Sequence, residues 1–337
     1  MPENAMELIT RELRSRGSEW FPDLGEPRAV RIVGHTPKSD HYIYDIVIDF
    51  ARLSERLAAK VYRAGKGVPA HIRASSECNA LRSIWSIATE RGLDGVPRPI
   101  GDFSIAGAVV CEKLPGIPLQ SIIMKAALLP GYAGLGLLQS AARAAGGWLR
   151  EFQQVAARPA RRLDGVALQA ELEKLCHRCK GEGLDDASIR KILTGSDAIL
   201  SRAGRLHTYS AVLNEFTPLN VVVSEQSAGF SEFARMEEDG SAFTDPATFL
   251  ACVEALEKYP FCTHTITTEV QESFLDAYAA TEPEREMLKV VKMKILLSMF
   301  VAGRTARESA ARKKVMWANV MKKFIQTAAD RSLPEAA

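Results

Sequence analysis

The sequence predicts an α+β protein, in which a small β-rich part with one helix precedes a larger, mostly helical part. Three observations lead to this prediction. Between residues 29 and 62, apolar and polar residues alternate in short segments, which is typical of strands with one buried face. From Leu135 to Gln154, apolar residues recur at three- and four-residue intervals, the period of an amphipathic helix. Later in the chain, a polar loop at residues 214–220 runs directly into the β-branched segment Val221-Val222-Val223, which is typical of a strand.

The composition excludes several classes of protein. Of the 337 residues, 47% are apolar and 25% are charged, which suits a large core and argues against disorder. The net charge of +2 gives no reason to expect nucleic acid or an anionic membrane as the partner. No apolar run reaches the roughly 18 residues of a membrane span, and the N-terminus lacks the apolar centre of a signal peptide. We therefore expect a cytoplasmic protein whose oligomeric state the sequence leaves open.

A helix and a connector are expected at residues 1–27, and the β-rich part at residues 28–113. A further helix is expected from about Ile72 to Arg91. Alternating patterns predict strands at residues 29–33, 42–48, 57–62, 101–105 and 108–113.

The segment from Gly34 to Asp40 connects the first two strands, and a connection of this kind can bind a phosphate group when it is rich in glycine. A glycine-rich turn works because its bare backbone amides approach phosphate closely, but this segment contains one glycine only. The side chains of Thr36, Lys38 and Ser39 can substitute as donors, and an ordinary hairpin is an equal alternative.

A connector at residues 114–118 ends the β-rich part, and the mostly helical part is expected at residues 119–330. We expect Asp245 to cap a helix whose first residue is Pro246. His207 is expected at a helix end or on the surface. Helical patterns cover about residues 135–154, 168–180, 185–203, 245–258, 266–280, 283–303 and 305–328.

The loop before the Val221 strand resembles the catalytic loop of the aminoglycoside phosphotransferase family. That family reads His-Gly-Asp-Phe-x-Pro-x-Asn, followed by a strand. Phe216, Pro218 and Asn220 match its fixed positions, and Thr217 fills the variable position between the first two. Three residues depart from it, because Leu213, Asn214 and Glu215 stand in place of His, Gly and Asp. The resemblance implies a two-lobed protein-kinase-like fold in which residues 114–118 form the hinge.

The resemblance also implies a nucleotide site in the β-rich lobe. Lys60, within Ala59-Lys60-Val61, takes the place of the strand lysine that contacts nucleotide phosphates, and Glu77 is its expected helix partner. Glu112-Lys113-Leu114-Pro115-Gly116 reproduces the family's hinge, so the backbone of Glu112, Lys113 and Leu114 is the expected adenine contact. Ser39 is the expected donor from the phosphate turn.

The implied chemistry is the transfer of a γ-phosphate from ATP or GTP to a hydroxyl group of a small molecule. Glu215 would act as the base or orient the hydroxyl, and Asn220 would ligate Mg²⁺. Glu232, in Glu232-Phe233-Ala234, aligns with the second metal-binding carboxylate. Members of the resembled family phosphorylate aminoglycosides, choline, amino acids and sugars.

Both acidic positions hold Glu where the family has Asp, which moves each carboxylate by about 1.5 Å, the length of one single bond. A misplacement of about 1 Å can lower a rate on the order of a hundredfold. Two hypotheses therefore stay open at the level of the sequence. Either the site is rebuilt around longer acids, or the chain is a pseudokinase-type module that binds a nucleotide without efficient catalysis.

Overall fold

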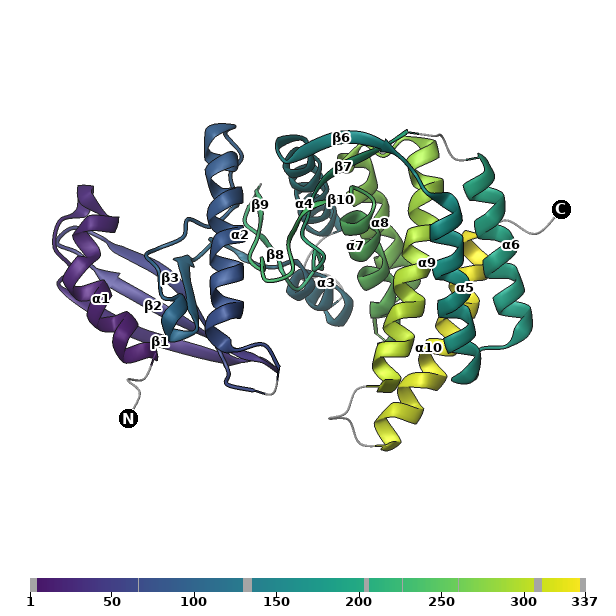
Figure 1. The fold of residues 1–337 in the computed structure, drawn as a ribbon, viewed down its shortest axis with the longest axis horizontal. Helices are drawn as coiled ribbons and strands as arrows, with labels where there is room; N and C mark the ends of the chain where they lie inside the picture. The colour runs from purple at the N-terminus through teal and green to yellow at the C-terminus, as the bar shows by residue number, and fades with distance from the viewer. Residues whose placement is uncertain are drawn as a thin grey trace. The chain divides into compact units, whose positions relative to one another are not determined.

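The structure is a computed structural model that describes residues 5–65, 67–129, 135–202, 206–225, 227–259, 261–305 and 311–333 (Figure 1). The chain divides into two compact units. The first comprises Met1–Gly116 and Gly229–Met236, and the second comprises Ile117–Ala228 and Glu237–Ala337. An antiparallel sheet dominates the first unit and helices dominate the second, which confirms the α+β prediction.

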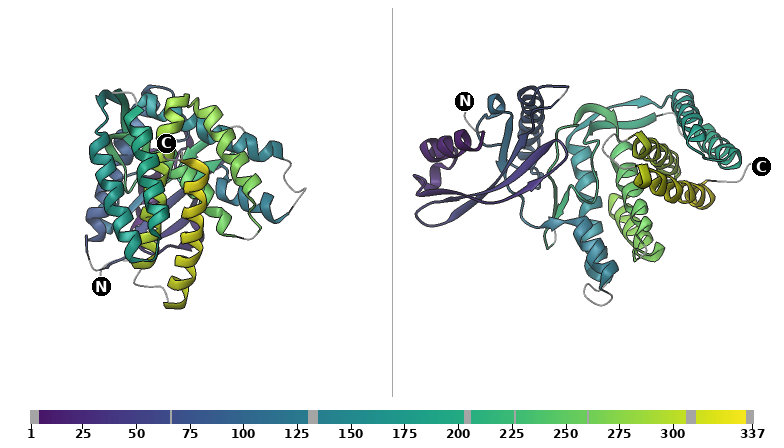
Figure 2. Two further views of the ribbon diagram at one scale, coloured as in Figure 1. Left: turned by 90° about the vertical axis from the view of Figure 1, so that its right-hand side faces the viewer. Right: turned by 90° about the horizontal axis from the view of Figure 1, so that it is seen from below.

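The first unit is built on a four-stranded antiparallel sheet with the strand order β1-β2-β3-β4. Helix α1 (Ala5–Trp20) lies against one face of this sheet (Figure 2). Met6, Ile9 and Leu13 are its buried apolar residues, and they belong to one core with the inward side chains of the strands. The remaining elements are β1 (Ala29–Pro37), β2 (His41–Asp49), β3 (Ser54–Tyr62), α2 (Ala70–Glu90) and β4 (Ala108–Glu112).

One predicted strand of the first unit is wrong. Residues 101–105 were expected to be extended, but Ser104–Ala106 form a 3-10 turn. The Asp102 carboxylate accepts hydrogen bonds from the Ser104 N–H at 3.0 Å and the Ser104 hydroxyl at 2.7 Å. This local side-chain bonding competes with strand pairing, and Gly107 closes the turn with a φ of 70°.

An eight-residue segment from later in the chain, Gly229–Met236, also belongs to the first unit. The Phe230 N–H donates to the Gly95 carbonyl at 3.0 Å. A Cβ atom on Gly229 would lie 2.5 Å from the same carbonyl oxygen, so this close approach requires glycine. The extended part of this region is β9 (Ala228–Phe230).

The second unit is mostly helical. Its helices α5, α6, α9 and α10 share one apolar core that contains Leu296, Phe300 and Ile325. Helices α4 and α8 pack closely because Gly146 leaves room for the Phe274 carbonyl, which a Cβ atom would approach to 2.3 Å. The helices are α3 (Leu119–Leu128), α4 (Leu135–Val155), α5 (Gly165–Gly181), α6 (Asp186–Arg202), α7 (Thr244–Glu254), α8 (His264–Tyr278), α9 (Glu282–Thr305) and α10 (Ala311–Ser332).

A three-stranded antiparallel sheet in the second unit was not predicted. Its order is β10-β7-β6, with β6 at Ala157–Arg162, β7 at Leu206–Val212 and β10 at Glu237–Ser241. The expectation for His207 is wrong, because it lies on β7, is 8% exposed and packs edge-on against Phe243 at 5.3 Å.

A short antiparallel pair in the second unit follows the candidate catalytic loop. β8 (Val221–Val223) pairs with β5 (Ile117–Pro118), in the register Ile117 with Val223. In the described ranges of the chain, no helix combines the length and the apolar character that crossing a membrane requires.

Candidate active site

The candidate catalytic loop leaves β7 at Leu213 and reaches β8 after Asn220. Leu213 is fully buried. Asn214 has a φ of 59°, in the left-handed region that favours glycine and that asparagine tolerates better than most residues. Asn in place of the glycine of the resembled pattern therefore keeps the backbone conformation that a glycine would allow.

Asp245 anchors the beginning of this loop. Its carboxylate accepts hydrogen bonds from the N–H groups of Leu213 and Asn214, each at 2.8 Å, and it is fully buried. The expectation that Asp245 caps a helix is wrong, because α7 begins one residue earlier, at Thr244. The sequence does not predict that Asp245 anchors the loop, because the two hydrogen bonds join residues more than 30 positions apart.

The environment of Asp245 shifts its ionisation. Burial raises the pKa of Asp245 to about 7, although the two backbone N–H donors act in the opposite direction. The charge of Glu237 adds to the increase in the pKa. Glu237 also accepts a hydrogen bond from the Asn214 side-chain amide at 3.1 Å, so it borders the same loop.

The rest of the loop is fixed by its own hydrogen bonds and by an aromatic core. The Asn220 side-chain amide donates to the Glu215 carbonyl at 3.0 Å, and the Thr217 N–H donates to it at 2.7 Å. Phe216 is fully buried and stacks on Trp148, with 5.9 Å between ring centroids and 3° between planes. A rigid loop therefore presents the partly exposed side chains of Glu215 and Asn220.

In the first unit, Lys60 of β3 lies between two acidic side chains. Its ammonium group is 3.1 Å from Glu77 of α2, so the expected ion pair is present. Glu232 also pairs with the same ammonium group. The three side chains are largely buried, with exposed fractions of 11% for Lys60, 4% for Glu77 and 13% for Glu232. The fold therefore brings Lys60 and Glu232 together although they are 172 positions apart in the sequence.

Further contacts hold Glu77 in place. The Tyr62 hydroxyl donates to it at 2.5 Å, and the Phe233 N–H donates at 3.4 Å. Burial raises the pKa of Glu77, while the charge of Lys60 and the Tyr62 hydroxyl lower it. Burial lowers the pKa of Lys60, but Glu77 and Glu232 raise it more, so Lys60 stays charged.

These contacts leave two acidic groups sharing one basic group. This excess of negative charge favours the binding of a further cation beside the two carboxylates. The chemistry of Glu232 and Asn220, a carboxylate and an amide oxygen, suits Mg²⁺. Among the described residues, however, no three or more His, Cys, Asp or Glu side chains form a metal-binding group. Glu232 belongs to the first unit and Asn220 to the second, so their joint ligation of a metal stays a prediction.

The expected adenine-binding backbone follows β4. The Glu112 N–H donates to the Arg98 carbonyl and the Lys113 N–H donates to the Arg56 carbonyl, both at 2.9 Å. Within the described ranges, the Leu114 N–H makes no hydrogen bond. Gly116 follows with a φ of 114°, which suits glycine alone. Leu114 is therefore the residue of the three whose N–H can bond a base.

The expected phosphate turn is shorter than residues 34–40. Strand β1 continues to Pro37 and β2 begins at His41, and the Lys38 N–H donates to the His41 carbonyl at 2.9 Å. Ser39 is exposed in this tight hairpin. The hairpin alternative thus describes the backbone, and phosphate binding by the Ser39 hydroxyl stays a prediction.

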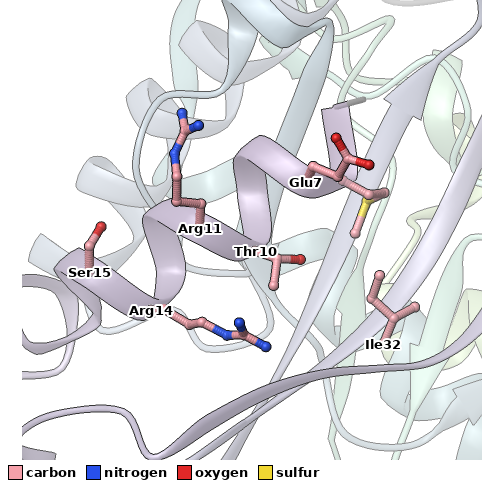
Figure 3. Close-up of a pocket in the computed structure, with 7 residues that line it drawn as sticks. Glu7, Thr10, Arg11, Arg14, Ser15 and Ile32 are labelled. Carbon is pink, nitrogen blue, oxygen red and sulfur yellow. The ribbon is translucent and has the colours of Figure 1, made fainter. Parts of the chain in front are cut away.

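A separate hollow of about 640 Å³ lies between α1 and β1 (Figure 3). Thr10 and Arg14 of α1 line it together with Ile32 of β1. None of the residues predicted for the nucleotide or the metal lines this hollow. It is therefore a surface feature apart from the candidate active site.

The fold resembles that of several solved kinases. A glucosamine kinase in complex with glucosamine, ADP and inorganic phosphate aligns with a TM-score of 0.51 at 12% identity, over 92% of this chain and 96% of the other. An amicoumacin kinase in complex with AMP-PNP, Ca²⁺ and Ami aligns with a TM-score of 0.52 at 14% identity, over 95% and 96%. An ADP-bound aminoglycoside phosphotransferase aligns with a TM-score of 0.55 at 13% identity, over 99% and 100%.

No model of a protein family matches the sequence, and no curated protein matches it either. The structural similarity therefore establishes the fold. The chain has the protein-kinase-like fold of aminoglycoside phosphotransferases and small-molecule kinases, which confirms the resemblance read from residues 213–220.

Proposed function

We propose that the chain is a phosphotransferase that moves the γ-phosphate of ATP or GTP to a hydroxyl group of a small molecule. The observation that carries this proposal is the buried cluster in which Lys60 bonds both Glu77 and Glu232. Phosphoryl transfer needs a charged lysine held beside a carboxylate that can bind a metal, and a purely structural sheet has no need to bury such groups.

In this proposal, Lys60 binds the nucleotide phosphates and Glu77 keeps its ammonium group in position. The Leu114 N–H bonds the base. Glu215 orients the acceptor hydroxyl and takes its proton as the oxygen bonds to the γ-phosphorus, while the bond to the β-phosphate oxygen breaks. Asn220 and Glu232 would hold Mg²⁺, which neutralises charge that develops on the phosphates. The nucleoside diphosphate then leaves.

The class of acceptor is supported by the similar structures, which include kinases of glucosamine, amicoumacin and aminoglycosides. These acceptors are small polar molecules with hydroxyl or amino groups. We therefore propose a sugar, an amino sugar or an amino alcohol as the acceptor. This choice rests on the shared fold and is tested by a panel of such compounds.

The test is a measurement of nucleotide binding and of turnover with the purified chain. We expect Mg²⁺ and ATP or GTP together to raise the melting temperature, and slow nucleotide hydrolysis that an acceptor accelerates. Glu215→Ala should abolish turnover while nucleotide binding persists, because Glu215 is assigned to the acceptor hydroxyl. Binding without any turnover in the unaltered chain would support the pseudokinase alternative. The absence of binding at millimolar nucleotide would refute the proposed function.

A further inference from the structure

Four residues at the end of the β1–β2 hairpin form a polar cluster that none of the assigned roles uses. We call Asp40, His41, Arg63 and Arg73 the Asp40 cluster. The Asp40 carboxylate accepts hydrogen bonds from His41 Nδ1 at 2.8 Å and from Arg73 at 2.9 Å. The Arg63 N–H donates to the Asp40 carbonyl at 2.9 Å, and Arg73 donates to the Arg63 carbonyl at 3.0 Å. The Asp40 carboxylate thus holds two basic side chains, those of His41 and Arg73, and Arg63 takes part through its backbone.

Each of these basic side chains has a buried nitrogen without a partner. In the part of the chain that the structure describes, His41 Nε2, Arg63 Nε and Arg73 Nε make no hydrogen bond. Among the described residues of the first unit, these three nitrogens are the buried side-chain polar atoms that lack a hydrogen-bond partner. Leaving a buried polar group unsatisfied costs about 1–3 kcal/mol, so a group of three calls for an explanation. The Arg63 guanidinium stacks on Tyr42, 4.2 Å from its ring centroid, on the face of the sheet opposite to His41. A bound anion on the face of His41 would satisfy His41 Nε2.

His41 is the best candidate to bind an anion, because it is only 8% exposed and water has little access to its unpaired Nε2. Its Nδ1 is already bonded to Asp40, which fixes the ring and leaves Nε2 as the atom that can reach a ligand. Burial opposes ionisation of Asp40, but His41, Arg73 and Lys60 together lower its pKa, so Asp40 is a carboxylate that accepts from Nδ1.

The register of the sheet places His41 beside the proposed phosphate-binding lysine. His41 pairs with Tyr62 across β2 and β3, and Lys60 lies two residues before Tyr62 on the same face. Such diagonal neighbours are roughly 7–8 Å apart, a distance that a diphosphate group can bridge.

Three basic side chains surround the ring of Tyr62. The Lys60 ammonium group is 5.1 Å from the ring centroid and the Arg73 guanidinium is 4.4 Å from it. The His41 ring centroid lies at 5.9 Å. The contacts around Tyr62 therefore place His41 and Arg73 on the same face of the sheet as Lys60.

We propose that His41 binds a phosphate oxygen of the nucleotide through Nε2, with Asp40 as its positioning residue. This inference rests on the proposed function and adds a phosphate contact to it. It also explains how a hairpin with a single glycine can serve a phosphate, because an imidazolium donor replaces the backbone amides of a glycine-rich turn. Burial and the charge of Lys60 lower the pKa of His41 in the free protein, and the negative charge of a phosphate beside Nε2 would raise it, so binding favours the protonated ring.

The test compares ligands with and without phosphate. Titration calorimetry of the full chain would measure the affinity for ADP with Mg²⁺, for pyrophosphate and for adenosine. We expect His41→Ala to weaken the binding of ADP and pyrophosphate by about ten-fold or more, and to leave adenosine binding unchanged. His41→Gln should lie between, because glutamine can donate a hydrogen bond but carries no charge. His71→Ala, which removes an exposed histidine of α2, is the matched control and should bind all three ligands normally.

The outcomes separate this inference from the proposed function. ADP binding that is equal in the unaltered chain and in both His41 variants would overturn the inference and leave the proposed function standing. An equal loss of adenosine and ADP affinity would overturn it as well, since that result reports damage to the fold. If the unaltered chain binds pyrophosphate through His41 but binds no nucleotide, the phosphate site stands and the proposed function fails.

The positioning role of Asp40 has a test of its own. Asp40→Asn should weaken ADP binding less than His41→Ala does. An Asp40→Asn variant that binds ADP normally would show that Asp40 does not position His41.

Discussion

Asn214 shows how one residue can depart from a family pattern and still keep the shape of a loop. Its φ of 59° is accessible to glycine and asparagine, but a β-branched side chain collides with the backbone there. We expect Asn214→Val to lower the free energy of unfolding by about 1–2 kcal/mol relative to Asn214→Gly. Both variants lose the bond to Glu237, so urea unfolding of the pair isolates the backbone effect. Equal stabilities would show that the loop relaxes out of this conformation.

Asp245 is the residue whose loss should most disturb the candidate catalytic loop. Without its carboxylate, the buried N–H groups of Leu213 and Asn214 lose their acceptor, at about 1–3 kcal/mol each. We expect Asp245→Ala to lower the free energy of unfolding by about 2–6 kcal/mol and to reduce turnover. Asp245→Asn retains one acceptor oxygen and should lose less. An Ala variant as stable as the unaltered chain would mean that water replaces the carboxylate.

The raised pKa of Asp245 also predicts how stability depends on pH. The folded chain keeps the proton up to about pH 7, whereas the unfolded chain releases it near pH 4. The folded state therefore binds more protons in this interval, and the contribution of Asp245 to stability falls as the pH rises from about 4 to about 7. Urea unfolding at pH 5 and pH 7 should show this fall relative to Asp245→Asn. The opposite slope would show that the two N–H donors keep Asp245 ionised.

At the scale of elements, the contact between α4 and α8 depends on one of two adjacent glycines. A Cβ atom on Gly146 would lie 2.3 Å from the Phe274 carbonyl, whereas a Cβ atom on Gly147 would meet no atom within 4 Å. We expect Gly146→Ala to destabilise the chain, because the helices must separate. Gly147→Ala should stabilise it by up to about 1 kcal/mol, the difference in helix propensity. Thermal unfolding of both variants measures the contrast, which equal effects would contradict.

Periodicity explains which elements the sequence could predict. The strands of the first unit and the long helices alternate between polar and apolar residues because each covers a core with one face. Strand β6 has no such signal, since all of its residues are exposed and it contains Pro159. His207 was misplaced for the same reason, because its neighbour β6 was not foreseen. The strand expected at residues 101–105 failed because Asp102 bonds its own backbone neighbourhood, an effect that hydrophobic patterns do not encode.

The candidate site was predictable where motifs carry fixed roles. The ion pair of Lys60 and Glu77 was expected from short matches, and the structure contains it. Glu232 was expected as a metal ligand and pairs with Lys60, so its role at a metal stays a prediction. The contacts of Asp245 and the role proposed for His41 were not foreseen. The first depends on hydrogen bonds, and the second on the lack of one, that only the folded chain defines.

At the scale of the whole molecule, the residues proposed for the nucleotide and its metal belong to two units, Lys60 to the first and Asn220 to the second. A ligand at one hundred times its Kd stabilises the folded state by about 2.7 kcal/mol. We expect Lys60→Met in the first unit and Asn220→Ala in the second to reduce this stabilisation by ADP and Mg²⁺. Lys174→Met, an exposed change on α5, is the control and should retain it. Full stabilisation of Asn220→Ala would show that Asn220 takes no part in binding ADP and Mg²⁺.

The segment Gly229–Met236 has a consequence for attempts to divide the chain. Because this segment completes the first unit from a distant part of the gene, a fragment that stops at Gly116 would lack Glu232 and the backbone partner of Gly95. In such a truncated product, Lys60 would lose its contact with Glu232, and Glu77 would lose the hydrogen bond from the Phe233 N–H. A dissection that keeps the β-rich unit whole must instead graft residues 229–236 onto it through an artificial linker.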